Sequence, residues 1–439
     1  MPTGSHGLDR DAVRRDQGAR LRAAMAELIA AAGYPAVRIA DLARLAHVSP
    51  PTLYSLYADK QQLFLGAYDD VARRAGEAIV HAFDEHDRDE LRLPAAFRAF
   101  GELAAEDPHG VSLLVSGALA AGPEVLDRRR HLLDALEAFV GARLDGSPRC
   151  EGDLIVRAQL GGIREVTAAR LRAGRQRELP ALADTLSRWV TCYPQRLPEG
   201  LAAPAAGAHD DAAEPTEAHA RSRPPSAPLP SGRSELSRQA IVKSQRERIV
   251  DATAAIVAEK GLAALTIPEI ARRANVSHET FYSIYPSKHD AFLGAQKVGM
   301  HQALRVTVEA YRAHERDWPA AVGAGLHALS CYLATEPDHA RLTMVDTYAA
   351  SPAAIATRES AMSAFRAYLT PSHERAPAQH PVVVEALVGG IWQLLHHYVE
   401  RGCAHELPAL TPQLTYFALT PFLGAEHAAS VALAAGPSG

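Results

Sequence analysis

The chain has 439 residues, of which 47% are hydrophobic and 22% are charged, so it can bury hydrophobic cores and is not a disordered chain. Its net charge of −5 means that any nucleic-acid binding must depend on a local patch. The 4 scattered cysteines exclude a disulfide framework. No uncharged apolar stretch approaches the ~18 residues of a membrane helix, and no secretory signal is evident. We therefore expect a cytoplasmic protein without a membrane segment.

An internal repeat organises the chain. Arg20–Ala67 aligns without gaps with Arg248–Ala295 at an offset of 228 residues, with 21 identities in 48 positions. The same offset relates the segment 161–163 (Gly-Gly-Ile) to 389–391, far downstream. One register kept over such a distance indicates a single domain that has been duplicated and fused.

Between the copies, residues 194–235 are rich in proline and alanine. The part from Pro194 to Pro230 holds 8 prolines and 10 alanines and no aromatic residue, which predicts a disordered linker. A flexible chain of that length spans roughly 35 Å, enough to let the two copies dock against each other. Residues 1–15 and the segment after His427 are expected to be frayed.

Each copy is predicted to be all-α. Apolar residues recur at helical spacing, as at Ile249, Ala252 and Ile256, and no alternating strand pattern stands out. Breaks at glycines and prolines predict about nine helices in each copy, three short ones first and longer ones after.

The segment 266–290 has the pattern of a helix-turn-helix. Thr266 and Glu269 form a capping box, so a helix begins there, and Asn275 tolerates the left-handed conformation that ends it. Ser277 caps a second short helix and Ser287 a third. Two short helices joined by a tight turn are typical of DNA-binding units, in which the second helix enters the major groove.

The two copies share polar residues in this unit that suit contacts with bases and phosphates. The predicted DNA-binding residues Thr266, His278 and Glu279 have no counterpart in copy one, and the others come in pairs: Ser49 and Ser277, Thr52 and Thr280, Tyr54 and Tyr282, Tyr57 and Tyr285, and Lys60 and Lys288. The lysines start a helix, where exposed N–H groups favour an anion. The alternative for Tyr57 and Tyr285 is a place in the core of the three-helix unit, as we expect for Leu53 and Phe281.

This stretch resembles the TetR family of transcriptional regulators, whose pattern is roughly T-x-x-x-I-A-x-x-A-G-V-S-x-x-x-x-Y-x-x-F-x-x-K-x-x-L. The resemblance implies a DNA-binding domain followed by a helical ligand-binding and dimerisation domain in each copy. The predicted domains are a DNA-binding domain at 16–66, an effector and dimerisation domain at 67–193, the linker at 194–235, a second DNA-binding domain at 241–294 and a second effector domain at 295–425.

The copies depart from the family pattern, and from each other. The turn glycine is His47 in copy one and Asn275 in copy two, and the helix-starting threonine is Arg38 in copy one. The first residues of the recognition helix are Pro50-Pro51 in copy one but His278-Glu279 in copy two. Proline is tolerated in a first turn but offers no side-chain donor, so copy one is expected to read fewer bases.

In the family, the last two helices of each domain form a four-helix bundle between two domains. The candidates are 153–173 with 180–192 and 381–401 with 408–422. We expect the two copies to pair as an intramolecular pseudo-dimer; the alternative is a homodimer of fused chains.

A pocket for a small apolar effector is expected between the DNA-binding unit and the bundle, although any one of its candidate residues could equally be ordinary core. The candidates are Phe97, Phe100, Leu114 and Arg164 in copy one and Trp318, Tyr332, Met344, Tyr348, Trp392 and His396 in copy two.

Enzyme chemistry finds no support in the sequence. There is no phosphate loop, dinucleotide fingerprint, H-E-x-x-H or CxxC pair. His396 and His397 are adjacent, so they point to different sides of a helix and do not form a metal pair. We expect no catalytic activity, cofactor or metal. The sequence predicts a ligand-responsive repressor that binds double-stranded DNA; the alternative is a helical ligand- or protein-binding module with degenerate helix-turn-helix units.

Overall fold

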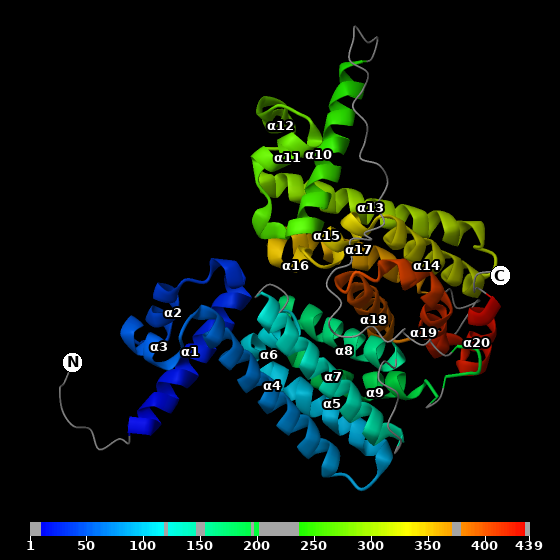
Figure 1. Ribbon diagram of the computed structural model, residues 1–439. Coiled ribbons are helices and arrows are strands. Elements are labelled where there is room, and N and C mark those ends of the chain that lie inside the picture. Colours follow the sequence, from blue (N-terminus) through cyan, green and yellow to red (C-terminus); the bar gives the residue numbers. More distant parts are fainter. Residues whose placement is uncertain are drawn as a thin grey trace. The chain divides into compact units, whose positions relative to one another are not determined.

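The computed structural model describes residues 10–117, 122–145, 154–194, 197–201, 237–370 and 379–434. Every regular element within these ranges is a helix, which confirms the predicted all-α fold class (Figure 1). The chain forms two compact units: unit one contains Met1–Phe139 and Arg164–Arg188, and unit two contains Val140–Ile163 and Trp189–Gly439. Unit two therefore holds all of copy two and part of copy one.

In copy one, three helices form the DNA-binding domain and six follow. They are α1 (Arg10–Ala32), α2 (Ile39–Leu45), α3 (Pro50–Leu56), α4 (Lys60–Asp84), α5 (Asp89–Glu106), α6 (Pro108–Val115), α7 (Pro123–Asp145), α8 (Leu154–Arg172) and α9 (Ala183–Thr191).

Copy two repeats this order with small additions, a one-turn helix before α17 and a helix after α19. Its helices are α10 (Arg238–Lys260), α11 (Ile267–Ala274), α12 (His278–Ile284), α13 (Lys288–Ala313), α14 (Trp318–Thr335), α15 (Pro337–Met344), α16 (Thr347–Ala350), α17 (Pro352–Tyr368), α18 (Pro381–Glu400), α19 (Thr411–Leu423) and α20 (Ala425–Ala434).

The helices at the start of each copy and at the end of the chain differ from the sequence predictions. Helices α1 and α10 are each 23 residues long rather than short, and α1 begins at Arg10, inside the segment that was expected to fray. The segment after Gly424 is helical as well. Gly424 breaks α19 with a φ of 78°, and the alanines that follow form α20, whose Ala428 and Ala432 are buried. Alanine has the highest helix propensity and fits a close helix contact.

The predicted linker lies almost wholly outside the described residues. At its start, residues 197–201 are part of the structure, and Leu201 is fully buried in unit two. Its carbonyl oxygen accepts a hydrogen bond from Gln413 Nε2 at 3.3 Å.

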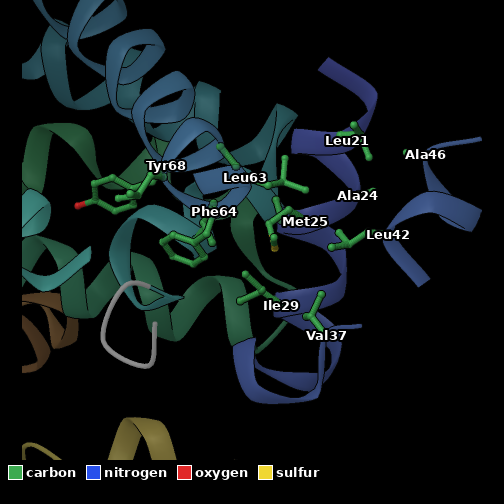
Figure 2. Packing of buried hydrophobic residues seen from close by; sticks show 14 of the residues in the cluster. Leu21, Ala24, Met25, Ile29, Val37, Leu42, Ala46, Leu63, Phe64 and Tyr68 are labelled. Atoms are coloured by element: carbon green, nitrogen blue, oxygen red, sulfur yellow. The ribbon is translucent and has the colours of Figure 1, made fainter. Parts of the chain in front are cut away.

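A single apolar cluster joins the DNA-binding domain of copy one to the helix that follows it. Leu21, Met25 and Ile29 recur every four residues on α1, so they share one face, and Leu63 and Phe64 of α4 pack against that face (Figure 2). Fully burying such a side chain contributes about 1.5–3 kcal/mol. Copy two has the equivalent cluster, which also includes Leu342 of α15 and Ala354 of α17.

The first half of α8 packs against α18 within unit two, and glycines bring the backbones together. A Cβ on Gly162 would overlap the carbonyl oxygen of Ala386 and lie 2.9 Å from the Trp189 ring. A Cβ on Gly390 would overlap the carbonyl oxygen of Ala158 and lie 2.9 Å from the Phe417 ring.

These contacts are reciprocal. Adding the repeat offset of 228 to Gly162, Ala158 and Trp189 gives Gly390, Ala386 and Phe417. Gly162 of copy one therefore meets Ala386 of copy two, and Gly390 of copy two meets Ala158 of copy one, while each aromatic ring lies against the glycine of its own copy.

One described helix, α18 (Pro381–Glu400), is long and apolar enough to cross a membrane by length and composition, and 89% of its most apolar window is buried inside the structure. Core helices of this kind pass the same test.

We predict that filling the glycine contact destabilises the chain. Gly162→Val and Gly390→Val should each lower the free energy of unfolding by about 1–3 kcal/mol, because the added side chain meets backbone that cannot move aside. Urea denaturation followed by far-UV circular dichroism measures the change.

Gly76 provides the control, since a Cβ there meets nothing within 4 Å. Gly76→Ala should raise the stability of the helix by roughly 0.5–1 kcal/mol. Equal stability of all three variants would show that the glycines do not set the helix contact.

Candidate DNA-binding surface

The turn before each recognition helix has the backbone that a helix-turn-helix requires. Asn275 has a φ of 49° and a ψ of 55°, and His47, at the same position of copy one, has a φ of 51°. They are the two non-glycine residues with positive φ in the described part of the chain. Both occupy the place where the family pattern has glycine, so each accepts a strained conformation in order to keep the turn.

Serine and threonine hydroxyls shape the start of the recognition helices. Ser277 Oγ caps α12 by accepting the backbone N–H of Thr280 at 3.0 Å, and it lies 2.9 Å from Thr280 Oγ1. Ser49 and Thr52 repeat the pair at the start of α3, with 2.8 Å between the hydroxyls. These hydroxyls therefore hold the helix start in addition to any contact with a ligand.

The recognition helices expose one aromatic side chain each. Tyr54 is 55% exposed and Tyr282 is 57% exposed, while Leu53 and Phe281, one position earlier, are fully buried. An exposed tyrosine at the same place in both copies suits a contact with DNA backbone. His278 and Glu279, and in copy one Pro50-Pro51, are also exposed.

The second tyrosine of each pair is a packing residue. Tyr57 accepts a hydrogen bond from Arg22 at 3.1 Å, and its ring covers Gly66, where a Cβ would lie 2.9 Å from the ring. Tyr285 covers Gly294 in the same way, at 2.6 Å, and burial raises the pKa of its hydroxyl. The placement agrees with the alternative prediction of a core role. Gly66 and Gly294 occupy matching positions of the repeat, but the sequence pattern did not predict that the tyrosine rings cover them.

The paired lysines bind backbone carbonyl oxygens within their own domain. Lys288 Nζ donates to Leu265 O at 2.7 Å, and Lys60 Nζ donates to Tyr34 O at 3.2 Å and to Val37 O at 3.1 Å. Each lysine therefore ties the start of α13 or α4 to the loop before the helix-turn-helix. An ammonium group has three donors, so a phosphate contact would be added to these bonds.

An arginine pair that sequence reasoning missed holds the turn itself. Arg248 donates to the carbonyl oxygens of Ala274 and Asn275, both at 2.7 Å. Arg20 makes the same bonds in copy one, to Ala46 O at 2.8 Å and His47 O at 3.3 Å. Arg20 and Arg248 are identical residues at the repeat offset, and this identity was the sequence signal that could have revealed them.

The start of the first helix of the motif differs between the copies as the sequence predicts. Thr266 caps α11 by accepting the Glu269 N–H at 3.4 Å, whereas Arg38 makes no side-chain cap on α2. Hydrogen bonds from Arg272 and Lys260 lower the pKa of Glu269 to about 2, so it stays ionised. Arg272 and its counterpart Arg44 remain exposed on the surface beside the motif.

Comparisons with known proteins agree with this geometry. Residues 21–67 and 249–294 each match the family described as bacterial regulatory proteins, tetR family. The chain is a tandem TetR-family DNA-binding regulator. The crystal structure of a TetR-like transcriptional regulator from Rhodococcus sp. RHA1 aligns at 23% identity over 41% of this chain and 96% of its own, with a TM-score of 0.35. No curated protein matches the chain.

The effector domain of copy two in this TetR-family chain contains an apolar cavity of about 70 Å³. Helices α13, α14, α15, α17 and α18 contribute its walls, and Met344 and Trp392, two of the predicted pocket residues, line it. Its polar groups are few, among them Thr307, Tyr311 and Tyr368.

Three other predicted pocket residues of copy two, Trp318, Tyr332 and His396, do not line this cavity. Trp318 is buried and donates to Tyr368 O at 3.2 Å, and the Tyr332 hydroxyl donates to Gly299 O at 3.3 Å. His396 is buried 3.7 Å from Glu400, and the side chain of Tyr348 lies outside the described residues. The side chains of Trp318 and Tyr332 thus each bond to a neighbouring helix, which is possible because a core helix has more than one buried face.

The pocket candidates of copy one lie on three helices of unit one. Phe97 and Phe100 are half-buried on α5, Leu114 of α6 packs against the core cluster of the DNA-binding domain, and Arg164 is half-buried on α8. Across the described residues of both copies, no group of three or more His, Cys, Asp or Glu side chains could hold a metal ion.

We predict that Arg248→Met loosens the DNA-binding domain of copy two. Loss of two hydrogen bonds from a charged donor should cost about 1.5–3 kcal/mol of domain stability. DNA affinity should fall alike for all sequences, because the turn that positions α12 is lost while its base-facing side chains are unchanged. Amide hydrogen exchange of α11 and α12, together with binding to a panel of duplexes, measures both effects.

Arg20→Met is the matched variant and should loosen α2 and α3 only. Unchanged exchange in both variants would contradict the role of these arginines.

Proposed function

We propose that this chain is a ligand-responsive repressor in which the two copies pair with each other and present two recognition helices to one imperfect palindromic operator. The observation that carries the proposal is the exposed tyrosine on a properly capped recognition helix in both copies. The chain acts in the cytoplasm, where chromosomal DNA is its partner, and it carries out no catalysis.

DNA binding is supported by what each recognition helix exposes. Tyr54 and Tyr282 can reach phosphates, whereas base reading needs side chains on the first turn. His278 and Glu279 provide a donor and an acceptor there; glutamate can accept a hydrogen bond from the cytosine amino group. Pro50-Pro51 provide neither. The alternative, a module with decayed helix-turn-helix units, does not explain why both copies keep the turn, the cap and the exposed tyrosine.

Ligand response is supported by the neighbours of α15. Thr343 and Met344 line the cavity, and the residue before them, Leu342, is fully buried in the core cluster of the second DNA-binding domain. A cavity of about 70 Å³ is smaller than the ~150 Å³ that accommodates benzene, so an effector must widen it. Moving α15 outward would shift α10 and with it the recognition helix α12.

Pairing of the copies is supported by the reciprocal contacts in unit two. Two identical surfaces that meet around a two-fold axis give contacts in which residue i meets j and j meets i. The Gly162–Ala386 and Gly390–Ala158 contacts follow this rule across the repeat. The Tyr193 hydroxyl of copy one also donates to Phe417 O of copy two at 2.8 Å, and the two rings stack with centroids 5.5 Å apart.

We predict that the two half-sites of the operator differ in specificity. Selection of bound sequences from random duplexes should return one constrained half and one loosely constrained half, with centres roughly 34–36 Å apart. Replacing His278 and Glu279 by alanine should relax the constrained half, since a good base contact is worth about 1–3 kcal/mol of discrimination.

Replacing Pro50 and Pro51 by alanine is the matched control and should change affinity and preference little. A symmetric operator, or equal loss of specificity in both variants, would contradict the asymmetry. Absence of any selected sequence, with binding that does not weaken between about 50 and 200 mM salt, would favour the non-DNA alternative.

We also predict that one chain occupies one operator. Sedimentation of the complex with a short duplex that carries the selected site should give one protein per duplex, because both recognition helices come from the same chain. Two chains bound obligatorily to each minimal site would instead support the homodimer of fused chains.

A further inference from the structure

The first helix of the second DNA-binding domain projects beyond that domain. Helix α10 begins at Arg238, where the side chain of Ser237 caps it, but its first buried residue is Ile249. Figure 1 shows this end of α10 reaching past α11 and α12. The segment 238–246 contains no buried residue, so packing does not account for its presence. We call this segment the arm of copy two, and the matching segment 10–18 of α1 the arm of copy one.

Basic side chains follow one face of the arm of copy two. Arg238, Val242 and Arg246 recur every four residues, so they share a face of the helix, and Lys243 lies beside Arg246, three residues before it. All four side chains are exposed. The three cations form no hydrogen bond or ion pair within the described residues. The arm therefore carries a basic stripe that no ion pair neutralises in the described part of the chain.

The matching face of α1 shows where such a stripe lies relative to a recognition helix. Arg14 donates to Ser55 O, in the last turn of α3, at 3.2 Å. Arg22 lies two turns further along the same face and donates to the hydroxyl of Tyr57, the residue that follows α3, at 3.1 Å. A Cβ on Gly18, between the two arginines, would lie 3.7 Å from the same hydroxyl oxygen. This face of α1 therefore runs along the C-terminal end of the recognition helix.

The repeat gives the corresponding face of α10. The offset of 228 places Val242, Arg246 and Val250 on it, and Val250 is buried in the core cluster of its own DNA-binding domain. Burial raises the pKa of Tyr285, the residue that follows α12, and the charge of Arg246 opposes this rise, which agrees with a place of Arg246 near the end of α12. Arg238 lies on the same face, two turns before Arg246. The stripe therefore begins beside the recognition helix and continues past it.

The two arms differ in charge. The arm of copy two has three cations and no acidic residue, whereas the arm of copy one has three cations and two aspartates, Asp11 and Asp16. Asp16 pairs with Arg20 at 3.0 Å. In copy two the positions of these aspartates are held by Gln239 and Ser244, which are uncharged. The arm of copy two is therefore the stronger attractor for an anionic partner.

The helix itself does not account for this charge. The helix dipole disfavours cations near a helix N-terminus, yet Arg238 is the first residue of α10. Duplex DNA carries one phosphate charge per about 1.7 Å of its axis. From Arg238 to Arg246 the helix spans about 12 Å at a rise of about 1.5 Å per residue, so the stripe is long enough to face several phosphates. Because the stripe begins beside α12, the DNA that α12 enters is the polyanion within its reach.

We propose that the arm of copy two is a DNA contact in addition to the helix-turn-helix, in which Arg238, Lys243 and Arg246 bind backbone phosphates that flank the half-site of α12, while the arm of copy one contributes little. The inference rests on the proposed binding of DNA by the recognition helices and extends it outward. Phosphate contacts fix register and orientation without reading bases, so the arm raises the affinity for every duplex alike. The half-site of copy two is therefore held over a longer stretch of backbone than that of copy one.

The salt dependence of DNA affinity tests the arm in the full chain. Fluorescence anisotropy measures binding to a labelled duplex of random sequence at sodium chloride concentrations between about 50 and 200 mM. The arm variant combines Arg238→Gln, Lys243→Gln and Arg246→Gln, which removes the charges but keeps a good helix former at each position. Far-UV circular dichroism checks that the variants keep the helix content of the unaltered chain.

A matched control removes the same charge elsewhere in unit two. It combines Lys297→Gln, Arg312→Gln and Arg316→Gln, at three exposed cations that form no hydrogen bond or ion pair within the described residues. Like the arm variant, it removes one lysine and two arginines, so both proteins have the same net charge. A third variant, Arg10→Gln with Arg15→Gln, changes the arm of copy one and leaves the bond from Arg14 to α3 in place.

The arm variant should show a weaker dependence of affinity on salt. Each phosphate contact contributes about 0.9 to the slope of log affinity against log salt concentration, so the loss of three contacts should reduce the slope by about 2.7. Over this fourfold range of salt, the decrease in affinity should then be roughly 40-fold smaller than in the unaltered chain. The matched control should keep the slope of the unaltered chain, and the copy-one variant should reduce it by no more than about one.

The proposal is overturned if the arm variant keeps the slope of the unaltered chain, or if the matched control or the copy-one variant reduces the slope as much as the arm variant does. Failure of the proposed function has a different signature. In that case the unaltered chain itself shows no salt-dependent binding to DNA, whereas an error about the arm alone leaves the salt-dependent binding of the unaltered chain intact.

Discussion

The DNA-binding domains of this chain depend on one arginine that satisfies the end of a helix. The last carbonyl groups of a helix have no partner within it, so side chains, water or a tightened last turn must satisfy them. Arg248 donates to two of these oxygens in copy two, and Arg20 does so in copy one. Because the carbonyl oxygens are held from α10 or α1, the left-handed residue that follows can be asparagine or histidine instead of glycine. The direction of the recognition helix is fixed by the same bonds.

A second constraint comes from the duplication. In a symmetric contact between two identical domains, each substitution changes both sides of the contact. After duplication and fusion, each side can change separately. Gly162 and Gly390 lie where the backbones of α8 and α18 come closest, and each faces a carbonyl group of the other copy. Side chains around them have changed, with Trp189 against Gly162 and Phe417 against Gly390, but both keep an aromatic ring. At the closest backbone contact only glycine fits, so the two copies keep the same residue. The aromatic residues around the glycines have more space, so they differ between the copies.

Local sequence signals were enough to predict the fold class, the repeat and the helix-turn-helix. Ser277 and Thr266 cap helices as expected, since capping requires a particular residue type at a particular place. The long-range partners were not predictable in this way. The pattern predicted Lys288 and Tyr285 as DNA contacts, with a core place as the alternative for Tyr285, but it did not indicate that Lys288 donates to Leu265 O or that Tyr285 covers Gly294. Whether a polar side chain faces a ligand or its own domain depends on partners that lie 20 or more residues away in the sequence. Composition has a similar limit: it predicted a frayed end where the structure has the helix α20.

The interiors of the two effector domains have diverged further than their DNA-binding domains. A DNA-binding domain must keep one external geometry, because the operator fixes the spacing and orientation of both recognition helices. An effector domain must keep only the contacts that connect its cavity to the helix that packs on the DNA-binding domain. In copy two those contacts run through Met344 and Leu342, so side chains on the opposite wall of the cavity can change without altering them. Trp392 of copy two and Arg164 of copy one, which occupy matching positions of the repeat, are such a change. Fusion makes this divergence accessible, since a chain that carries both copies can alter one interior while the other is unchanged, which a homodimer of identical chains cannot do.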